Sequence, residues 1–97
     1  MMKINQERAI KLASSGQAIL IDTRSPVEFN KGTMHGAINL VLRNISTLVA
    51  IVKDRKTSLV FFGTDAYMAA QYAFTMGFPK VFYIENLIIP SEEKVKS

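Results

Sequence analysis

The sequence predicts an α/β fold, built as an open, mostly parallel β-sheet of four to five strands with helices on both faces. Short, continuous apolar runs recur at residues 18–22, 37–42, 58–62 and 80–84, which is typical of strands buried on both faces. Stretches with helical spacing of apolar residues separate these runs. Strands that alternate with helices across short connections form parallel sheets with right-handed crossovers.

The first helix is expected over residues 4–16. Apolar residues fall there at near-helical spacing, Asn5 is a candidate N-cap, and Gly16 has the position that commonly ends a helix. The apolar run at 18–22 follows directly and predicts a buried strand.

A short helical stretch is predicted over residues 25–32, with Pro26 just inside it. The next strand is expected within residues 37–42. Residues 43–54 then repeat apolar side chains at the i, i+3, i+4 and i+7 positions of a helix: Ile45, Leu48, Val49 and Val52. This repeat favours a helix despite the β-branched side chains in it.

The third buried strand is expected at 58–62 and the fourth at 80–84. Between them, Thr64 or Asp65 is predicted to cap a helix that Gly77 ends. Four alanines of this helix allow close packing against the sheet: Ala66, Ala69, Ala70 and Ala73.

The composition fits one globular domain. Of 97 residues, 48% are hydrophobic and 21% are charged, which predicts a single domain over residues 1–90 and a short charged tail at 91–97. The net charge of +4 is spread along the chain, and the one basic cluster, residues 53–56, is interpreted as a solvated loop. We therefore expect no nucleic-acid partner.

The chain has no cysteine, which excludes disulfides, thiolate metal sites and thiol chemistry within it. With a single histidine and no clustered carboxylates, we expect neither a metal site nor a cofactor. The opening residues are polar and charged, and no apolar stretch reaches the ~20 residues that span a bilayer. The expected location is cytoplasmic, without membrane contact.

Polar residues follow two of the predicted strands, at 22–25 and at 63–66. In open parallel sheets, ligand sites lie at the carboxyl ends of the strands. These two segments are therefore the candidate site.

Residues 20–40 resemble the N-terminal signature of rhodanese-like domains. That signature has an Asp-x-Arg after a strand, a Glu-aromatic pair on a short helix, and a glycine turn that leads into the next strand. The matching residues are Asp22, Arg24, Pro26, Glu28, Phe29, Gly32, Gly36, Ala37, Ile38 and Asn39. Residues 77–87 are similar to the strand that ends the family's sheet, so the resemblance implies the rhodanese fold over nearly the whole chain.

The resemblance fails at the family's nucleophile. In rhodanese-like sulfurtransferases the strand that corresponds to 58–62 ends in a cysteine, and backbone N–H groups of the following loop wrap its thiolate. Matched by strand register, Phe62 occupies that position, whereas counting back from Gly77 reaches Val60. Either match leaves no sulfur nucleophile. The equivalent loop, a possible binding site, is short: Gly63, Thr64, Asp65 and Ala66.

Neither polar residue of this loop is a good substitute for the cysteine. Thr64 would need an adjacent base, and His35, the one histidine, belongs to another turn. Asp65 is expected to cap the helix through its carboxylate, and its negative charge should repel a persulfide or a phosphate.

The signature residues imply a structural role. By resemblance, Asp22 and Arg24 brace the turn beneath the loop through an ion pair that includes Glu28, and Gly36 belongs to the signature turn. The alternative makes Arg24 an anion contact. His35, in the same turn as Gly36, is interpreted as a local hydrogen-bonding residue.

The C-terminal segment also departs from the family. Glu85 and Asn86 replace its Gly-Gly pair and the closing helix is truncated, which leaves Leu87, Ile88 and Ile89 without an obvious cover. They either fold back onto the sheet or form a surface for self-association or a protein partner.

Two functions remain open. The first is a catalytically inactive rhodanese-like domain that serves as a binding, regulatory or assembly module. The second is a sulfur-transfer or phosphatase-like enzyme of the sulfurtransferase family that uses a non-cysteine group or a partner's thiol. The second predicts an open cavity around residues 63–66 with Arg24 facing it, whereas a turn packed shut by Phe61 or Phe62 counts against it.

Overall fold

The computed structural model describes residues 1–89 and confirms the predicted α/β fold. Five strands form one parallel sheet in the order β1-β5-β4-β2-β3. Their bounds are β1 (Met2–Lys3), β2 (Ala18–Asp22), β3 (Ile38–Asn39), β4 (Ser58–Phe62) and β5 (Val81–Tyr83). Residues 91–97, predicted to form a charged tail, lie outside the described residues.

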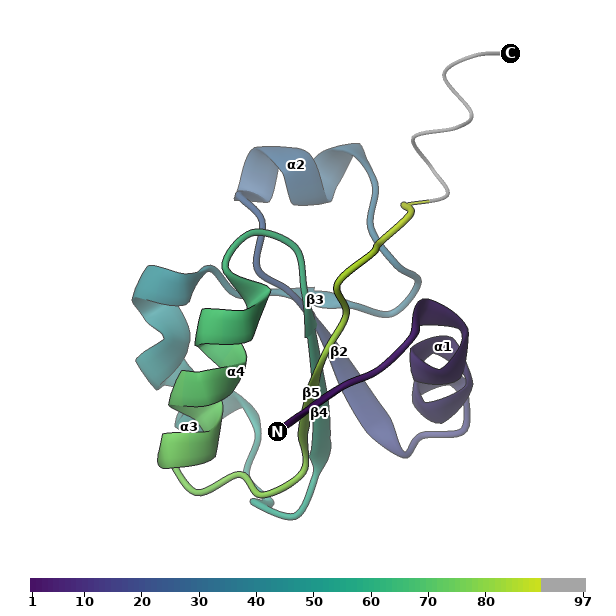
Figure 1. The fold of residues 1–97 in the computed structure, drawn as a ribbon. Coiled ribbons are helices and arrows are strands. Elements are labelled where there is room, and N and C mark those ends of the chain that lie inside the picture. The colour runs from purple at the N-terminus through teal and green to yellow at the C-terminus, as the bar shows by residue number, and fades with distance from the viewer. Residues whose placement is uncertain (90–97) are drawn as a thin grey trace, which may run out of the picture.

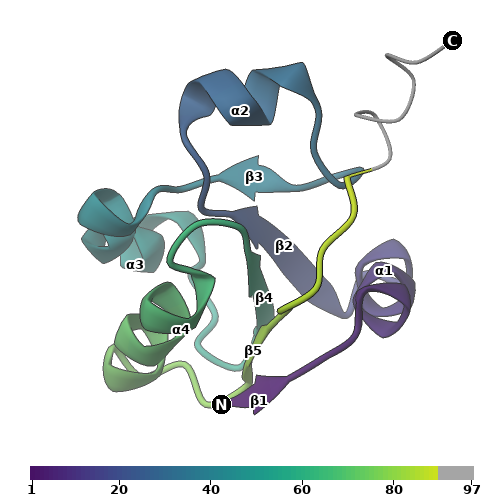
Figure 2. The same ribbon diagram turned by 45° about the horizontal axis from the view of Figure 1, so that its top comes forward.

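Helices cover both faces of this sheet (Figures 1 and 2). One face is covered by α1 (Gln6–Ser14), and the other by the 3-10 helix η1 (Leu42–Thr47), α3 (Leu48–Ile51) and α4 (Ala66–Thr75). The short helix α2 (Pro26–Lys31) lies beyond the carboxyl end of β2. Within residues 1–89, no helix has the length and apolarity to cross a bilayer, and the cytoplasmic location stays a prediction.

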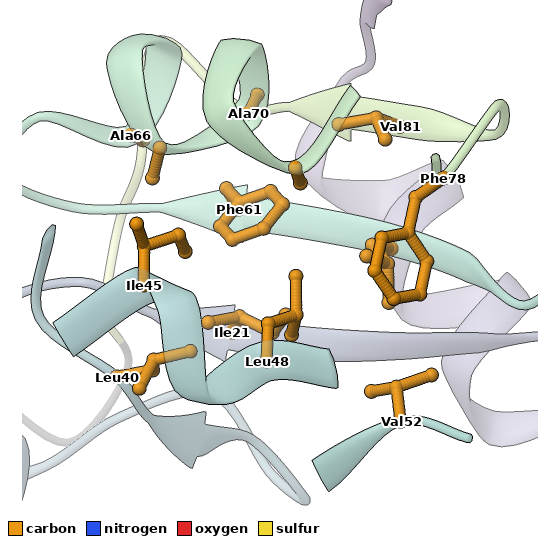
Figure 3. Close-up of a cluster of buried hydrophobic side chains, with 13 residues drawn as sticks. Ile21, Leu40, Ile45, Leu48, Val52, Phe61, Ala66, Ala70, Phe78 and Val81 are labelled. Atoms are coloured by element: carbon orange, nitrogen blue, oxygen red, sulfur yellow. The ribbon is translucent and has the colours of Figure 1, made fainter. Parts of the chain in front are cut away.

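Alternate side chains of β4 build the two cores. Leu59 and Phe61 point to the α4 face, whereas Val60 and Phe62 join the cluster on the α1 face, and all four are fully buried. Figure 3 shows Phe61 beneath α4, near Ala70. The small alanine side chains let α4 approach the sheet closely, as the sequence predicted.

The predicted helix at 43–54 is divided. Its first part is the 3-10 helix η1, in which Asn44 has non-helical angles (φ −106°, ψ 16°), and only Leu48–Ile51 is α-helical. Stiff β-branched side chains favour such short, irregular turns. The apolar repeat nevertheless identified the buried side of this segment, because Ile45, Leu48 and Val52 are buried against the sheet.

The two ends of the described chain meet. Met2 of β1 pairs with Phe82 of β5. The side chain of Gln6 donates to the carbonyl oxygen of Ile88 at 2.6 Å and accepts from its N–H at 2.9 Å. Ile89 is buried in the α1-side core and Leu87 packs against it. Of the segment predicted as a partner surface, Ile88 is therefore the exposed residue.

Candidate functional site

The carboxyl ends of β2 and β4 lie side by side, with Asp22 opposite Phe62. Thr23, in the first of the two candidate segments, joins the two strand ends. Its N–H donates to the carbonyl oxygen of Phe62 at 2.9 Å, and its hydroxyl contacts the carbonyl oxygens of Phe62, at 3.0 Å, and of Thr64. A buried hydroxyl thus fixes the turn that follows β4.

Asp22 is a fully buried carboxylate at the centre of a bonded network. Arg24 donates to it from its backbone N–H at 2.9 Å and from its guanidinium at 2.9–3.2 Å. Thr33 donates its hydroxyl at 2.7 Å. The guanidinium also donates to the carbonyl oxygen of Gly32, and it lies 3.8 Å from the Glu28 carboxylate. Arg24 is thus engaged within the protein.

Asn39, a further residue of the signature, holds this network in place. The side-chain amide of Asn39 donates to the carbonyl oxygens of Asp22, at 3.0 Å, and of Arg24, at 2.8 Å. Gly36 has φ 83° in the turn before β3, a conformation that glycine adopts without strain. Five residues of the signature are therefore joined in one network by hydrogen bonds and ion pairs: Asp22, Arg24, Glu28, Gly32 and Asn39.

Gly63 is the point where this network contacts the loop. It has φ 105°, and a Cβ atom there would lie 2.7 Å from Cγ of Arg24 and 3.2 Å from Oδ1 of Asp22. Only glycine fits this position without displacing the arginine.

Asp65 does not cap α4 through its side chain, so that prediction was wrong. Its backbone is left-handed, with φ 59°, and its carboxylate makes no hydrogen bond to the first turn of α4. Capping residues have extended backbone angles, as Asn5 and Ser25 have at α1 and α2. The turn is closed instead by the N–H of Ala66, which donates to the carbonyl oxygen of Gly63 at 3.2 Å.

Neither Phe61 nor Phe62 covers the loop, since both side chains lie within the cores. An open pocket of about 530 Å³ adjoins it, and its lining includes Gly63, Asp65, Ala66, Tyr67, Tyr83 and Glu85. Arg24 is not among the lining residues. The enzyme hypothesis predicted an open cavity beside the loop and an arginine that faces it. The structure has the cavity, but Arg24 does not line it.

The pocket carries two carboxylates. Asp65 is exposed, and Glu85 accepts from the Lys3 ammonium at 3.1 Å with both side chains largely in solvent. The rings of Tyr67 and Tyr83 pack edge to face, with centroids 5.0 Å apart. Tyr83 and Glu85 come from the end of β5 and were not predicted, because no motif in the sequence connects them to residues 63–66.

His35 lies elsewhere. It is exposed in the turn before β3 and lines a groove of about 750 Å³ between α1 and β3. Among residues 1–89, no group of three His, Asp or Glu side chains is placed to hold a metal ion.

The family model of the rhodanese-like domain matches residues 5–86. The chain belongs to this family. Solved structures support the fold of this rhodanese-like domain. The human single-domain sulfurtransferase TSTD1 has a TM-score of 0.74 at 22% identity, over 98% of this chain and 96% of that one.

Two prokaryotic structures are similarly close. A rhodanese-related protein of Thermoplasma volcanium has a TM-score of 0.76 at 18% identity, over 97% of this chain and 93% of the other. A protein of unknown function from Rhodopseudomonas palustris, described as a possible tyrosine phosphatase, has a TM-score of 0.77 at 21% identity, over 98% and 82%.

One curated relative is closer in sequence. The uncharacterized protein BU052 of Buchnera aphidicola is 31% identical over 88 residues, which are 86% of this chain. This rhodanese-like domain spans 61% of the length of that relative.

Proposed function

We propose that this rhodanese-like domain does not transfer sulfur and works as a binding, regulatory or assembly module. One observation carries the proposal: the three-residue turn Gly63–Asp65 joins β4 to α4 in a chain without cysteine. Sulfur transfer in the family needs a thiolate in this place.

The charges around the turn support the same conclusion. A persulfide or phosphate that entered the pocket would meet the carboxylates of Asp65 and Glu85. The nearby Lys3 ammonium is paired with Glu85, and the Arg24 guanidinium is held by the buried carboxylate of Asp22. Like charges at short range disfavour an anion.

The test is a thiosulfate-to-cyanide sulfurtransferase assay on the purified chain and on Thr64→Cys. Thr64 is exposed in the turn, so a thiol there reaches solvent, whereas Phe62→Cys would place it in the α1-side core. We expect no turnover in either protein, because the turn offers carboxylates where a thiolate needs positive charge. Turnover by the parent chain would overturn the proposal.

The second candidate function is a sulfur-transfer enzyme that uses the thiol of a partner. The open pocket beside Gly63 favours it, because a partner's thiol could enter there. The same assay with added glutathione separates the two functions. Under the main proposal, the rate with glutathione is the same with and without the protein. An increase that depends on the protein would favour the enzyme.

A further inference from the structure

We propose that two copies of this chain associate through the outer face of α4, with the two helices antiparallel about a two-fold axis. This inference is independent of the catalytic question, because its test measures association and not turnover, although Asp65 and Tyr67 of this surface also line the pocket beside Gly63.

The outer face of α4 is uncharged and mostly apolar, with Gln71 and Thr75 as its exposed polar residues. Tyr67, Met68, Tyr72 and Phe74 are each 47–52% exposed, whereas the alanines on the other side of the helix are buried. Figure 1 shows α4 and α3 in the layer that covers one face of the sheet. Tyrosine, phenylalanine and methionine are enriched at protein interfaces and depleted from ordinary surface.

The same stretch carries no charge. Residues 66–79 contain no Asp, Glu, Lys, Arg or His, in a chain whose net charge is +4. Two copies repel each other through their net charge, and this repulsion is weakest where they meet through an uncharged face. The net charge is therefore only a small obstacle to pairing of two copies through this face.

Charges at the two ends of α4 set the direction of pairing. Asp65 lies at its N-terminal end. Arg55 lies at its C-terminal end, where Nε donates to the carbonyl oxygen of Met76 at 3.2 Å and the guanidinium stacks 5.0 Å from the ring of Phe78. An antiparallel pair places Asp65 of each copy near Arg55 of the other. It also brings the positive N-terminal end of each helix dipole beside the negative C-terminal end of the other.

The size of the face sets the strength of association. A half-exposed aromatic side chain leaves about 100 Å² accessible, so four such residues supply about 400 Å² per copy. Both copies together bury less than the roughly 1,200 Å² of a stable interface. We therefore expect a weak dimer, in exchange with monomer at micromolar concentrations.

Gln71 gives the sharpest test. It is exposed near the middle of the ten-residue helix, so a two-fold axis brings it close to Gln71 of the second copy. Gln71→Lys or Gln71→Glu then places like charges opposite each other, whereas a mixture of the two variants places opposite charges there.

The experiment is sedimentation velocity over a concentration series, on the parent, each Gln71 variant, their equimolar mixture, and Val27→Lys as a control. Val27 is 65% exposed on α2, away from α4. We expect reversible dimer in the parent and in Val27→Lys. Each Gln71 variant alone should associate at least about tenfold more weakly, and the mixture should regain the parent's affinity.

Three results would overturn the proposal. The parent could remain monomeric at every concentration, which would mean that α4 does not bind a second copy. The Gln71 variants could associate like the parent, which would place the contact on another surface. The mixture could stay as weak as its components, which would rule out the two-fold arrangement. Circular dichroism of each variant checks that it is folded.

Discussion

Asp22 shows what a single residue does in this fold. Its carboxylate is fully buried, and three donors of Arg24 and the hydroxyl of Thr33 hold it. A buried ion pair of this kind adds little net stability, because desolvation offsets the attraction, but removing one partner leaves a costly unpaired charge. The network therefore fixes the geometry beneath the loop.

Asp22→Asn is expected to lower the free energy of unfolding by about 3–5 kcal/mol, because the largely buried guanidinium of Arg24 loses its counter-charge. Urea unfolding measures the loss. Lys3→Ala is the control, since the side chains of the Lys3–Glu85 pair are 60% and 57% exposed and such a pair is worth under about 1 kcal/mol. Equal losses in the two variants would contradict the structural role of Asp22.

Gly63→Ala should destabilise the domain more than Gly36→Ala. Both glycines have positive φ, so both variants are strained, but only at Gly63 does a Cβ atom meet Arg24 Cγ, at 2.7 Å, while nothing lies within 4 Å of it at Gly36. We expect an additional loss of about 1–3 kcal/mol from this overlap. Paired thermal or urea unfolding tests it, and identical losses would mean that Arg24 moves aside freely.

At the scale of elements, the helices begin in different ways. Asn5 caps α1 by accepting from the N–H of Arg8 at 2.8 Å, and Ser25 caps α2 by accepting from the N–H of Glu28 at 3.2 Å. At α4 the side chain of Asp65 makes no such bond. Packing of its alanines against β4 therefore holds α4 in place more than capping does.

Ala70→Leu is expected to cost about 1–3 kcal/mol of stability, because the larger side chain cannot fit between α4 and Phe61 without moving the helix. Gln71→Ala, one position along on the exposed side, should change stability by less than about 0.5 kcal/mol. Chemical unfolding of both variants checks the contrast. A tolerated leucine would show that α4 is loosely packed.

At the scale of the whole molecule, the sheet is completed by segments from opposite ends of the described chain. β1 pairs with β5, and Gln6 bonds Ile88 twice. These contacts hold residues 85–89 against α1, so that Ile89 fills the core on that face.

Gln6→Ala should release this segment. We expect the amide of Ile88 to exchange with solvent at least about tenfold faster, because the loss of roughly 1.4 kcal/mol from two hydrogen bonds corresponds to that factor. Amide hydrogen exchange measures it, with Lys3→Ala as a control that removes only the neighbouring exposed ion pair. Unchanged protection would mean that packing of Ile89 alone retains the segment.

Local patterns were enough to predict four strands of the sheet and the alanine face of α4, and the resemblance to the family implied the ion pair of Asp22 and Arg24. Three features of the structure could not be predicted from the sequence. β1 has only two residues, too few to give a sequence pattern, and is a strand because the edge of β5 offers it hydrogen bonds. Aspartate is a common capping residue, but the left-handed backbone of Asp65 prevents the hydrogen bond from its side chain to the first turn of α4. The pocket is lined by both Asp65 and Glu85, which follow the neighbouring strands β4 and β5, and no sequence spacing predicts that they share a pocket.

The pairing of β1 with β5 also has a consequence for how the chain folds as it is synthesised. Gln6 and its partner Ile88 are 82 positions apart, so β1, the first of the five strands along these residues, is among the last to find its place in the sheet. β2 and β4 can pair long before β5 exists, and closing so long a loop is slow compared with forming local contacts. The outer edge of the sheet is therefore completed only when nearly all of these residues have been translated.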